Sequence, residues 1–188
     1  MSDSKGRTLL VDASVFITLA EIGLTSALLD AEGDVVVPKP VESEITSEPA
    51  VSVLSSACDD ERIETSDIGL APIDTAASHL GKELSNEDVP GTGHATIEGD
   101  IGLLALALPE SELDSPVVVS DDKPLRQTCK ALSIPVSGSI GVLVRAVQRG
   151  DIDAEEAKDK LYAMDEVGAR LSVSLVRRAE RLIDEAAE

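Results

Sequence analysis

The stretch Thr8-Leu9-Leu10-Val11-Asp12-Ala13-Ser14 decides the fold class that we expect for this chain. A short apolar run ends on a carboxylate, and a small residue and a hydroxyl follow it. Continuous Val, Leu and Ile runs are typical of strands buried in a parallel sheet, and in open α/β sheets the chemistry lies just beyond the carboxyl ends of such strands. Asp12 therefore stands where a functional carboxylate is expected, although an Asp after a strand also begins turns and caps helices.

Strand and helix patterns alternate up to Gly150. Apolar strands are predicted at 34–37 and 117–119, a further strand at 62–65 and a short one at 134–136. Helical patterns separate them, with Gly or Pro at several of the boundaries. This alternation predicts an α/β fold in which a central, mainly parallel sheet lies between two layers of helices.

The pattern changes after Gly150, where two helical segments follow without a strand. A capping-box pattern begins the first segment, and the second is expected at about 172–186. The predicted organisation is a domain at 1–150, with a polar insertion at about 66–96, and a C-terminal helical hairpin at 151–188. The hairpin either covers the sheet or forms the interface of a homodimer.

The composition is strongly acidic. With 36 acidic and 16 basic residues, the 188-residue chain carries a net charge of −20. Such a charge is typical of the solvated surfaces of halophilic, haloarchaeal-type proteins, because about 1 M salt shortens the Debye length to roughly 3 Å and screens the repulsion. One Phe, one Tyr and no Trp count against a module that binds single-stranded nucleic acid by stacking bases on aromatic rings.

The sequence also indicates a compartment. Cys58 and Cys129 match no metal-site spacing, no apolar run is long enough to span a bilayer, and no signal peptide is recognisable. We therefore expect a reduced, soluble, cytoplasmic protein without a membrane partner. His79 and His94 do not stand at ligand spacing, so surface or loop positions are expected for them.

Two further acids follow a predicted strand as Asp12 follows its own. Asp121 and Asp122 come directly after the apolar run at 117–119. Either of them, taken alone, would be interpreted as a helix cap. Because the carboxyl ends of parallel strands meet at one edge of the sheet, we expect these carboxylates close to Asp12.

Two acids on predicted helices complete the candidate set. Asp100 shares the apolar face of a helix predicted from about 96 to 108, whereas Glu98 falls on the opposite face. Glu44 follows the second strand, with Glu42 as the alternative. Carboxylates gathered at one sheet edge would repel each other unless a divalent cation neutralised them, and oxygen ligands without His or Cys favour Mg²⁺ or Mn²⁺.

Five short motifs carry a resemblance to a known family. They are Leu10-Val11-Asp12-Ala13-Ser14; Val37-Pro38 with Val41 and Glu44-Ile45; Glu98-Gly99-Asp100 with Leu104-Ala105-Leu106-Ala107; Val118-Val119-Ser120-Asp121-Asp122-Lys123 with Leu125-Arg126; and Ile134-Pro135-Val136-Ser137-Gly138-Ser139-Ile140-Gly141-Val142-Leu143. In this order and spacing they resemble the PIN-domain ribonucleases of prokaryotes and archaea, including VapC-like toxins. The resemblance covers most of the chain outside 58–96.

This resemblance implies a PIN-like α/β/α sandwich that hydrolyses RNA with Mg²⁺ or Mn²⁺. Carried over by motif, Asp12, Glu44 and Asp100 are the first three catalytic acids. The fourth is Asp121 or Asp122, and the family's pattern of a hydroxyl two residues before the acid favours Asp122. The implied metal ligands are Asp12 and Asp100, together with Asp121 or Asp122.

The resemblance and the charge pattern also suggest contacts to an RNA substrate. Ser14 and Ser120 carry hydroxyls beside the acids, and Lys123 and Arg126 follow the acids of the fourth motif. Several basic residues after position 121 either form a positive rim for RNA or only stabilise helices. They are Lys123, Arg126, Lys130, Arg145 and Arg149.

Other functions fit these acids less well. A phosphatase of the Asp-x-Asp class needs a second Asp where Ser14 stands, and a receiver domain needs its Asp after the third strand, where only Thr65-Ser66-Asp67 is present. A PIN-like scaffold that binds partners without catalysis does not need all four acids. Within the nuclease interpretation, a toxin silenced by a small antitoxin protein and a housekeeping enzyme of RNA processing both stay open.

Overall fold

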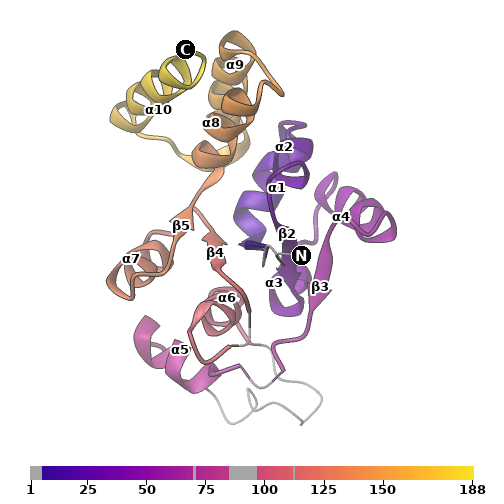
Figure 1. The fold of residues 1–188 in the computed structure, drawn as a ribbon, viewed down its shortest axis with the longest axis vertical. Coiled ribbons are helices and arrows are strands. Elements are labelled where there is room, and N and C mark those ends of the chain that lie inside the picture. The colour runs from indigo at the N-terminus through magenta and orange to yellow at the C-terminus, as the bar shows by residue number, and fades with distance from the viewer. Residues whose placement is uncertain (1–5, 70, 85–96, 112) are drawn as a thin grey trace, which may run out of the picture.

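The computed structural model describes residues 6–69, 71–84, 97–111 and 113–188 as an α/β fold (Figure 1). Its sheet has five parallel strands in the order β3-β2-β1-β4-β5. The predicted parallel sheet is therefore confirmed. The strands are β1 (Thr8–Val11), β2 (Asp34–Pro38), β3 (Glu64–Ser66), β4 (Pro116–Val119) and β5 (Val136–Ser137).

The central strand is β1, in which every residue is buried. It pairs on one side with β2 and on the other with β4, so that Leu10 lies opposite both Val36 and Val118. The ladder extends one residue beyond the strand, because the backbone N–H of Asp12 donates to the carbonyl oxygen of Val119 at 2.9 Å. The sheet itself thus fixes Asp12 at its carboxyl edge.

The helices surround the sheet in two layers. They are α1 (Ala13–Glu21), α2 (Thr25–Leu29), α3 (Lys39–Glu44), α4 (Ala50–Asp59), α5 (Ile73–Leu80), α6 (Gly99–Ala107), α7 (Lys123–Ala131), α8 (Ser139–Arg149), α9 (Ala154–Met164), the π-helical turn η1 (Asp165–Ala169) and α10 (Val173–Ala186). Because crossovers between parallel strands are right-handed, the helices after β1 and β2 lie on one face and those after β3 and β4 on the other. In agreement, α1 contacts α3 and α4, whereas α5, α6 and α7 contact one another.

Helix α6 lies in the core of the second layer. All its residues except Asp100 are buried, because it contacts β1, β2 and β4 as well as α3, α5 and α7. A helix that is apolar on every side belongs inside a core. The sequence predicted only one apolar face here. Asp100 is the one position at which α6 carries a charge, and it stands in the first turn, at the edge of the sheet.

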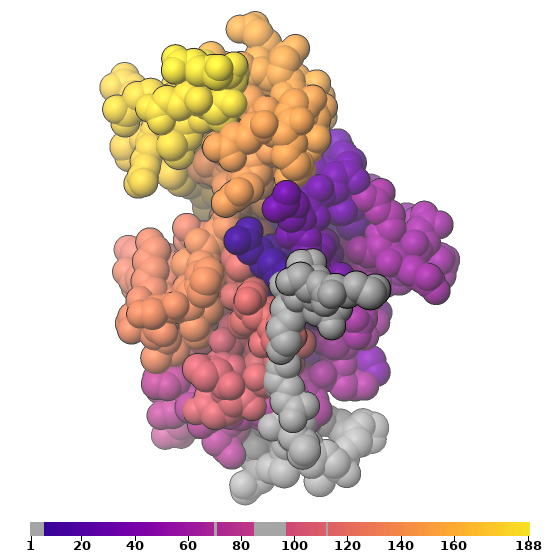
Figure 2. Space-filling view, in the orientation of Figure 1, coloured from indigo at the N-terminus to yellow at the C-terminus, as the bar shows by residue number. Residues whose placement is uncertain are grey.

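The C-terminal helices form one end of the molecule, and α5 lies at the other (Figure 1). Helix α8 contacts α1 and α2, and α9 and α10 pack against α8, burying Leu161, Met164 and Ile183 completely. In the space-filling view this part stands above α7 with a notch between them (Figure 2). The predicted helical hairpin therefore packs mainly on α8. Its use as a homodimer interface stays a prediction.

Several predicted boundaries differ from the structure. The residues after Asp12 predict a helix capped by Ser14, but α1 begins at Ala13 and its N-cap is Asp12, which the β1–β4 ladder holds in an extended conformation. The helix predicted from about 96 begins at Gly99. Residues 85–96 of the predicted insertion, including His94, lie outside the described residues.

The cysteines, His79 and the helix lengths can be compared directly with what the sequence predicted. Cys58 and Cys129 are free thiols, and burial raises the pKa of Cys129 to about 11, as expected for a cysteine that packs as a small apolar side chain. His79 is exposed on α5. In the described part of the chain, none of the helices has both the length and the apolar character to cross a membrane.

Candidate active site

The carboxyl edge of the sheet brings the predicted acids together. Asp12 follows β1, Asp122 follows β4, and the charges of these two carboxylates interact. Glu44 ends α3, Asp100 lies in the first turn of α6, and these two helices pack against each other. The charges of both Asp12 and Asp100 act on Glu44. We call Asp12, Glu44, Asp100 and Asp122 the acidic cluster.

Asp12 is the buried member of the cluster, with 9% of its surface exposed. Its Oδ2 accepts hydrogen bonds from the hydroxyls of Ser120, at 2.6 Å, and of Ser14, at 3.0 Å. Burial raises the pKa of Asp12 above its ordinary 3.8, and the charge of Asp122 adds to that effect, although the hydroxyls lower it in part. The two predicted serines are therefore the groups that orient this carboxylate.

Ser120 connects two members of the cluster. Its buried hydroxyl donates to Asp12 and accepts a hydrogen bond from the backbone N–H of Asp122 at 3.0 Å. Asp122 in turn caps α7, because its Oδ1 accepts from the backbone N–H of Leu125 at 2.7 Å. One hydroxyl thus sets the spacing between the acid that follows β1 and the acid that follows β4.

The neighbouring acid, Asp121, faces a different element. Its carboxylate accepts hydrogen bonds from the backbone N–H of Ser139, at 3.1 Å, and from the hydroxyl of Ser139, at the start of α8. A Cβ on Gly138 would lie only 2.2 Å from Asp121 Oδ1, so the glycine permits this approach. Asp121 is therefore occupied in joining β4 to α8.

Arg126 is bound to backbone carbonyls. Its guanidinium donates to the carbonyl oxygen of Ser120 at 2.7 Å and to that of Ser137. These bonds join the ends of β4 and β5 directly behind the cluster. The sequence suggested an RNA contact for this arginine, and the structure places it as a support for Ser120. Lys123, by contrast, is exposed at the start of α7.

Glu44 reaches the amino end of α6. Its Oε1 accepts the backbone N–H of Gly99 at 2.8 Å, and a Cβ on Gly99 would lie 2.8 Å from the same oxygen. Desolvation and the charges of Asp12, Asp100 and Glu98 raise the pKa of Glu44, although its side chain stays accessible to solvent. The alternative acid, Glu42, is exposed, and its charge acts on Lys39 and Cys58 instead of on the acids of the cluster. Glu44 is therefore the acid of α3 that joins the cluster.

Lys82 also belongs to the site, and no sequence pattern predicted it there. Its ammonium lies 2.6 Å from Asp100 Oδ2 and 2.5 Å from Glu98 Oε2. Gly81, at φ 68°, ends α5, and the backbone N–H of Lys82 then donates to the carbonyl oxygen of Ala77 at 2.9 Å. Burial lowers the pKa of Lys82, but the two ion pairs outweigh it and raise the pKa overall.

Lys82 also corrects the expectation for Glu98. The sequence placed Glu98 and Asp100 on opposite faces of one helix, which is wrong, because α6 begins only at Gly99 and Glu98 is still extended. Both carboxylates therefore meet the same ammonium. No local pattern in the sequence indicated this contact, since Lys82 lies 16 residues before Glu98 and 18 before Asp100.

Comparisons with known proteins agree with this geometry. The family model DUF3368, described as a PIN domain, matches residues 8–185 and so includes all four acids of the cluster. This chain belongs to the PIN-domain family. Neither the curated proteins nor the solved structures gave a match.

Membership in the PIN-domain family indicates the general class of activity. PIN domains are generally nucleases that act on nucleic acids, and they typically use divalent metal ions. In the described part of this PIN domain, no group of three or more His, Cys, Asp or Glu side chains is arranged closely enough to hold a metal ion as it stands. The carboxylates lie beside one another, but serine hydroxyls, helix ends and Lys82 engage them.

The predicted positive rim of this PIN domain is not one surface. Lys123 and Arg126 follow the acids at the carboxyl end of β4, whereas Arg145 and Arg149 line a separate cavity under α8. Arg149 forms an ion pair with Asp151.

The raised pKa of Asp12 predicts the effect of removing its charge. Because the folded state binds this proton more tightly than the unfolded state, the ionised carboxylate lowers stability at neutral pH, and the penalty disappears as the pH falls through the raised pKa towards 3.8. Asp12→Asn, measured by thermal unfolding in EDTA at pH 7, should therefore raise Tm by roughly 2–4 °C, which corresponds to about 1 kcal/mol. The gain should shrink as the pH is lowered.

The exposed residue Asp34 provides the matched control. Asp34→Asn should leave Tm nearly unchanged at both pH values. A lower Tm for Asp12→Asn at pH 7, or a gain that does not depend on pH, would contradict the electrostatic description of the cluster.

Proposed function

We propose that this PIN domain is a divalent-metal-dependent ribonuclease that hydrolyses RNA phosphodiester bonds. The observation that carries the proposal is the convergence of the acidic cluster, in which burial and neighbouring charges raise the pKa of both Asp12 and Glu44. Carboxylates in such surroundings are costly to ionise. A cation bound among these carboxylates would neutralise their mutual repulsion, and this relief would add to the affinity of the site for the cation.

The donor set suits a hard divalent cation. The cluster contains only carboxylate oxygens, without His or Cys, which is the chemistry that Mg²⁺ and Mn²⁺ prefer. We assign Asp12, Asp100 and Asp122 as the residues that would hold such an ion, with Glu44 beside them. When bound, the ion would make water a stronger nucleophile and stabilise the leaving oxygen of the phosphodiester.

The remaining residues would orient the groups that react. Ser14 and Ser120 hold Asp12 by its Oδ2, which fixes the direction of its other oxygen. Glu44 combines a raised pKa with an accessible side chain, so it is suited to accept the proton of an attacking water. We assign the fourth acidic position to Asp122, since Asp121 is engaged by Ser139.

RNA would meet few cations at this site. Lys123 is exposed directly after Asp122 and is available to a phosphate. The guanidinium of Arg126 is used by two carbonyls, so its role would be to keep Ser120 in position. Phosphate contacts weaken in high salt, and binding would therefore depend mainly on the metal ion. This is consistent with an enzyme adapted to a salt-rich cytoplasm.

The same chemistry would serve a toxin or an RNA-processing enzyme. As a VapC-like toxin, the protein would be silenced by a small antitoxin protein. As a processing enzyme, it would need no such partner. A catalytically inactive PIN-like scaffold is the alternative from another class of function, and it is distinguished by the absence of metal-dependent cleavage.

Cleavage of mixed RNAs in molar KCl with Mn²⁺ tests the proposal. The wild-type protein should cleave RNA, and EDTA, Asp12→Asn or Asp122→Asn should each reduce the rate at least about a hundredfold, which corresponds to about 2.7 kcal/mol of transition-state stabilisation. Asp122→Asn keeps a side-chain oxygen that can cap α7, so folding should be retained.

Asp121→Asn separates the two neighbouring acids. It should lower Tm, because it weakens the bonds to Ser139, and yet retain cleavage per folded molecule. Asp34→Asn should change neither property. A folded wild-type protein that binds no Mn²⁺ and cleaves no RNA would contradict the proposal and favour the catalytically inactive scaffold.

A further inference from the structure

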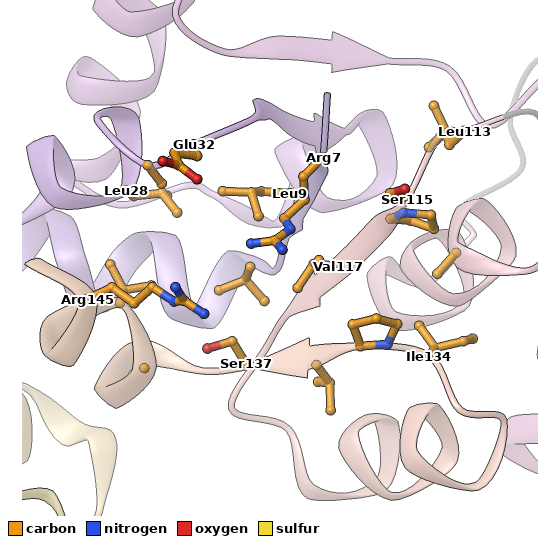
Figure 3. Close-up of a pocket in the computed structure, with 18 of the residues that line it drawn as sticks. Arg7, Leu9, Leu28, Glu32, Leu113, Ser115, Val117, Ile134, Ser137 and Arg145 are labelled. Atoms are coloured by element: carbon orange, nitrogen blue, oxygen red, sulfur yellow. The ribbon is translucent and has the colours of Figure 1, made fainter. Parts of the chain in front are cut away.

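A cavity of about 830 Å³ lies on the side of the sheet covered by α2 and α8, above β1, β4 and β5 (Figure 3). Small-molecule sites typically have volumes of roughly 300–1,000 Å³. None of the four acids of the cluster lines this cavity, so it is separate from the candidate active site. Nothing in the nuclease chemistry requires it.

The cavity has an apolar floor and walls. Leu9, Val117 and Val119 contribute the floor from the sheet, and Leu28 of α2 and Val142 of α8 contribute the walls. The described lining contains no aromatic residue on which a base could stack. These surroundings suit the apolar body of a small molecule better than a nucleic acid.

Two arginines extend into the cavity from opposite sides. Arg7 precedes β1 and Arg145 lies on α8, and their guanidinium groups point towards one another across the floor (Figure 3). Both side chains are exposed, and within the described residues neither forms an ion pair or a side-chain hydrogen bond. A third arginine, Arg149, is held at the rim by Asp151 and by the carbonyl oxygen of Ala27.

The charge of this lining opposes that of the chain. Three arginines and one acid, Glu32, line the cavity, in a protein with 36 acidic and 16 basic residues. The two guanidinium groups over this apolar floor have no side-chain partner among the described residues, so their hydrogen-bond donors are available to a planar or tetrahedral anion.

We propose that this cavity is a binding site for a small amphiphilic anion, a molecule with a carboxylate, sulfonate or phosphate on an apolar body. The anionic group lies between Arg7 and Arg145, and the apolar body rests on Leu9 and Val117. A second copy of this acidic chain is a poorer occupant, since the recess is concave and the two surfaces carry the same net charge.

The test uses 8-anilinonaphthalene-1-sulfonate, an amphiphilic anion whose fluorescence rises in apolar sites, and N-phenyl-1-naphthylamine, a similar uncharged molecule. The sulfonate should bind at one saturable site, and the double variant Arg7→Gln/Arg145→Gln should weaken it about tenfold. The affinity of the same double variant for the uncharged probe should change less than about twofold. Val117→Phe, which fills the floor, should weaken both probes.

Arg177→Gln/Arg181→Gln provides a control with the same change in net charge on the exposed side of α10. The proposal would be overturned if both double variants weakened sulfonate binding equally. It would also be overturned if Arg7→Gln/Arg145→Gln weakened the binding of both probes equally. Sedimentation that shows a dimer and no probe binding would also overturn it, in favour of a second copy as the occupant.

A second inference rests on the proposed function and concerns Lys82. Among the described residues, it is the cation that pairs with a carboxylate of the acidic cluster. Its ammonium lies on Oδ2 of Asp100, while Oδ1 of Asp100 accepts the backbone N–H of Ile101 at 2.8 Å. A cation that binds Asp100 through Oδ2 must therefore share this oxygen with Lys82 or displace it.

We infer that Lys82 is a positioning residue that competes with the divalent ion for Asp100 and so sets the affinity of the site for metal. Displaced from Asp100, the ammonium stays tethered to Glu98 beside the cluster, where it is available to an RNA phosphate. The pairing also keeps Asp100 aligned when no ion is present, because it offsets the repulsion from Glu44.

Calorimetric titration with Mn²⁺ in the absence of RNA tests this inference. Lys82→Met should tighten Mn²⁺ binding about tenfold, because a competing positive charge is removed, and should raise KM for RNA more than it lowers kcat. Lys82→Arg should resemble the wild type. Lys39→Met, which removes an exposed lysine paired with Asp67, is the matched control and should change neither quantity.

The two possible failures are distinguishable. If neither the wild type nor Lys82→Met binds Mn²⁺, the proposed metal-dependent function is wrong. If both bind Mn²⁺ with the same affinity and KM is unchanged, the metal site is retained and the inference about Lys82 is wrong.

Discussion

The hydrogen bond from the Ser120 hydroxyl to the carboxylate of Asp12 is the constraint on which the site depends. This bond joins the residues that follow the two central strands. The β1–β4 ladder fixes how far Asp12 lies from Ser120, because the backbone N–H of Asp12 is the last donor of that ladder. Arg126 holds the other side of Ser120 through its carbonyl oxygen. A buried carboxylate is costly, and hydroxyl donors offset only part of that cost. The fold therefore maintains at its edge a charge that would be more stable with a cation beside it.

The fold and the first acid could be predicted because their signals are local. A continuous apolar run that ends on Asp12 predicts a buried parallel strand with a carboxylate at its end, and the structure has both. The neighbouring acids after β4 show the limit of this reasoning. Asp121 and Asp122 are adjacent, and only the family's hydroxyl-x-acid pattern favours Asp122 over Asp121, whereas strand and helix patterns give both the same surroundings. They are distinguished by Ser139, which lies 18 residues away and becomes a neighbour only when α8 returns to the sheet.

Long-range contacts also explain what the sequence did not indicate. Lys82 and Asp100 meet because α5 and α6 pack together, and no periodicity within either segment encodes that distance. The arginines Arg7 and Arg145 lie far apart in the sequence, so their convergence over one apolar floor was not predictable from the excess of acidic residues. In so acidic a protein the position of each cation is informative. The structure places Lys82 at the acidic cluster, and over a separate cavity it places Arg7 and Arg145, which pair with no other side chain among the described residues.

We propose that Asp12, Glu44, Asp100 and Asp122 form one metal site. Anomalous diffraction from crystals soaked in Mn²⁺ tests it most directly, because it locates the ion independently of activity. We expect a manganese peak bonded to carboxylate oxygens of Asp12 and of Asp100 or Asp122, with Glu44 beside it and the Lys82 ammonium no longer on Asp100. Well-ordered crystals with no manganese at the carboxyl edge of the sheet, or with manganese bound only elsewhere, would contradict it.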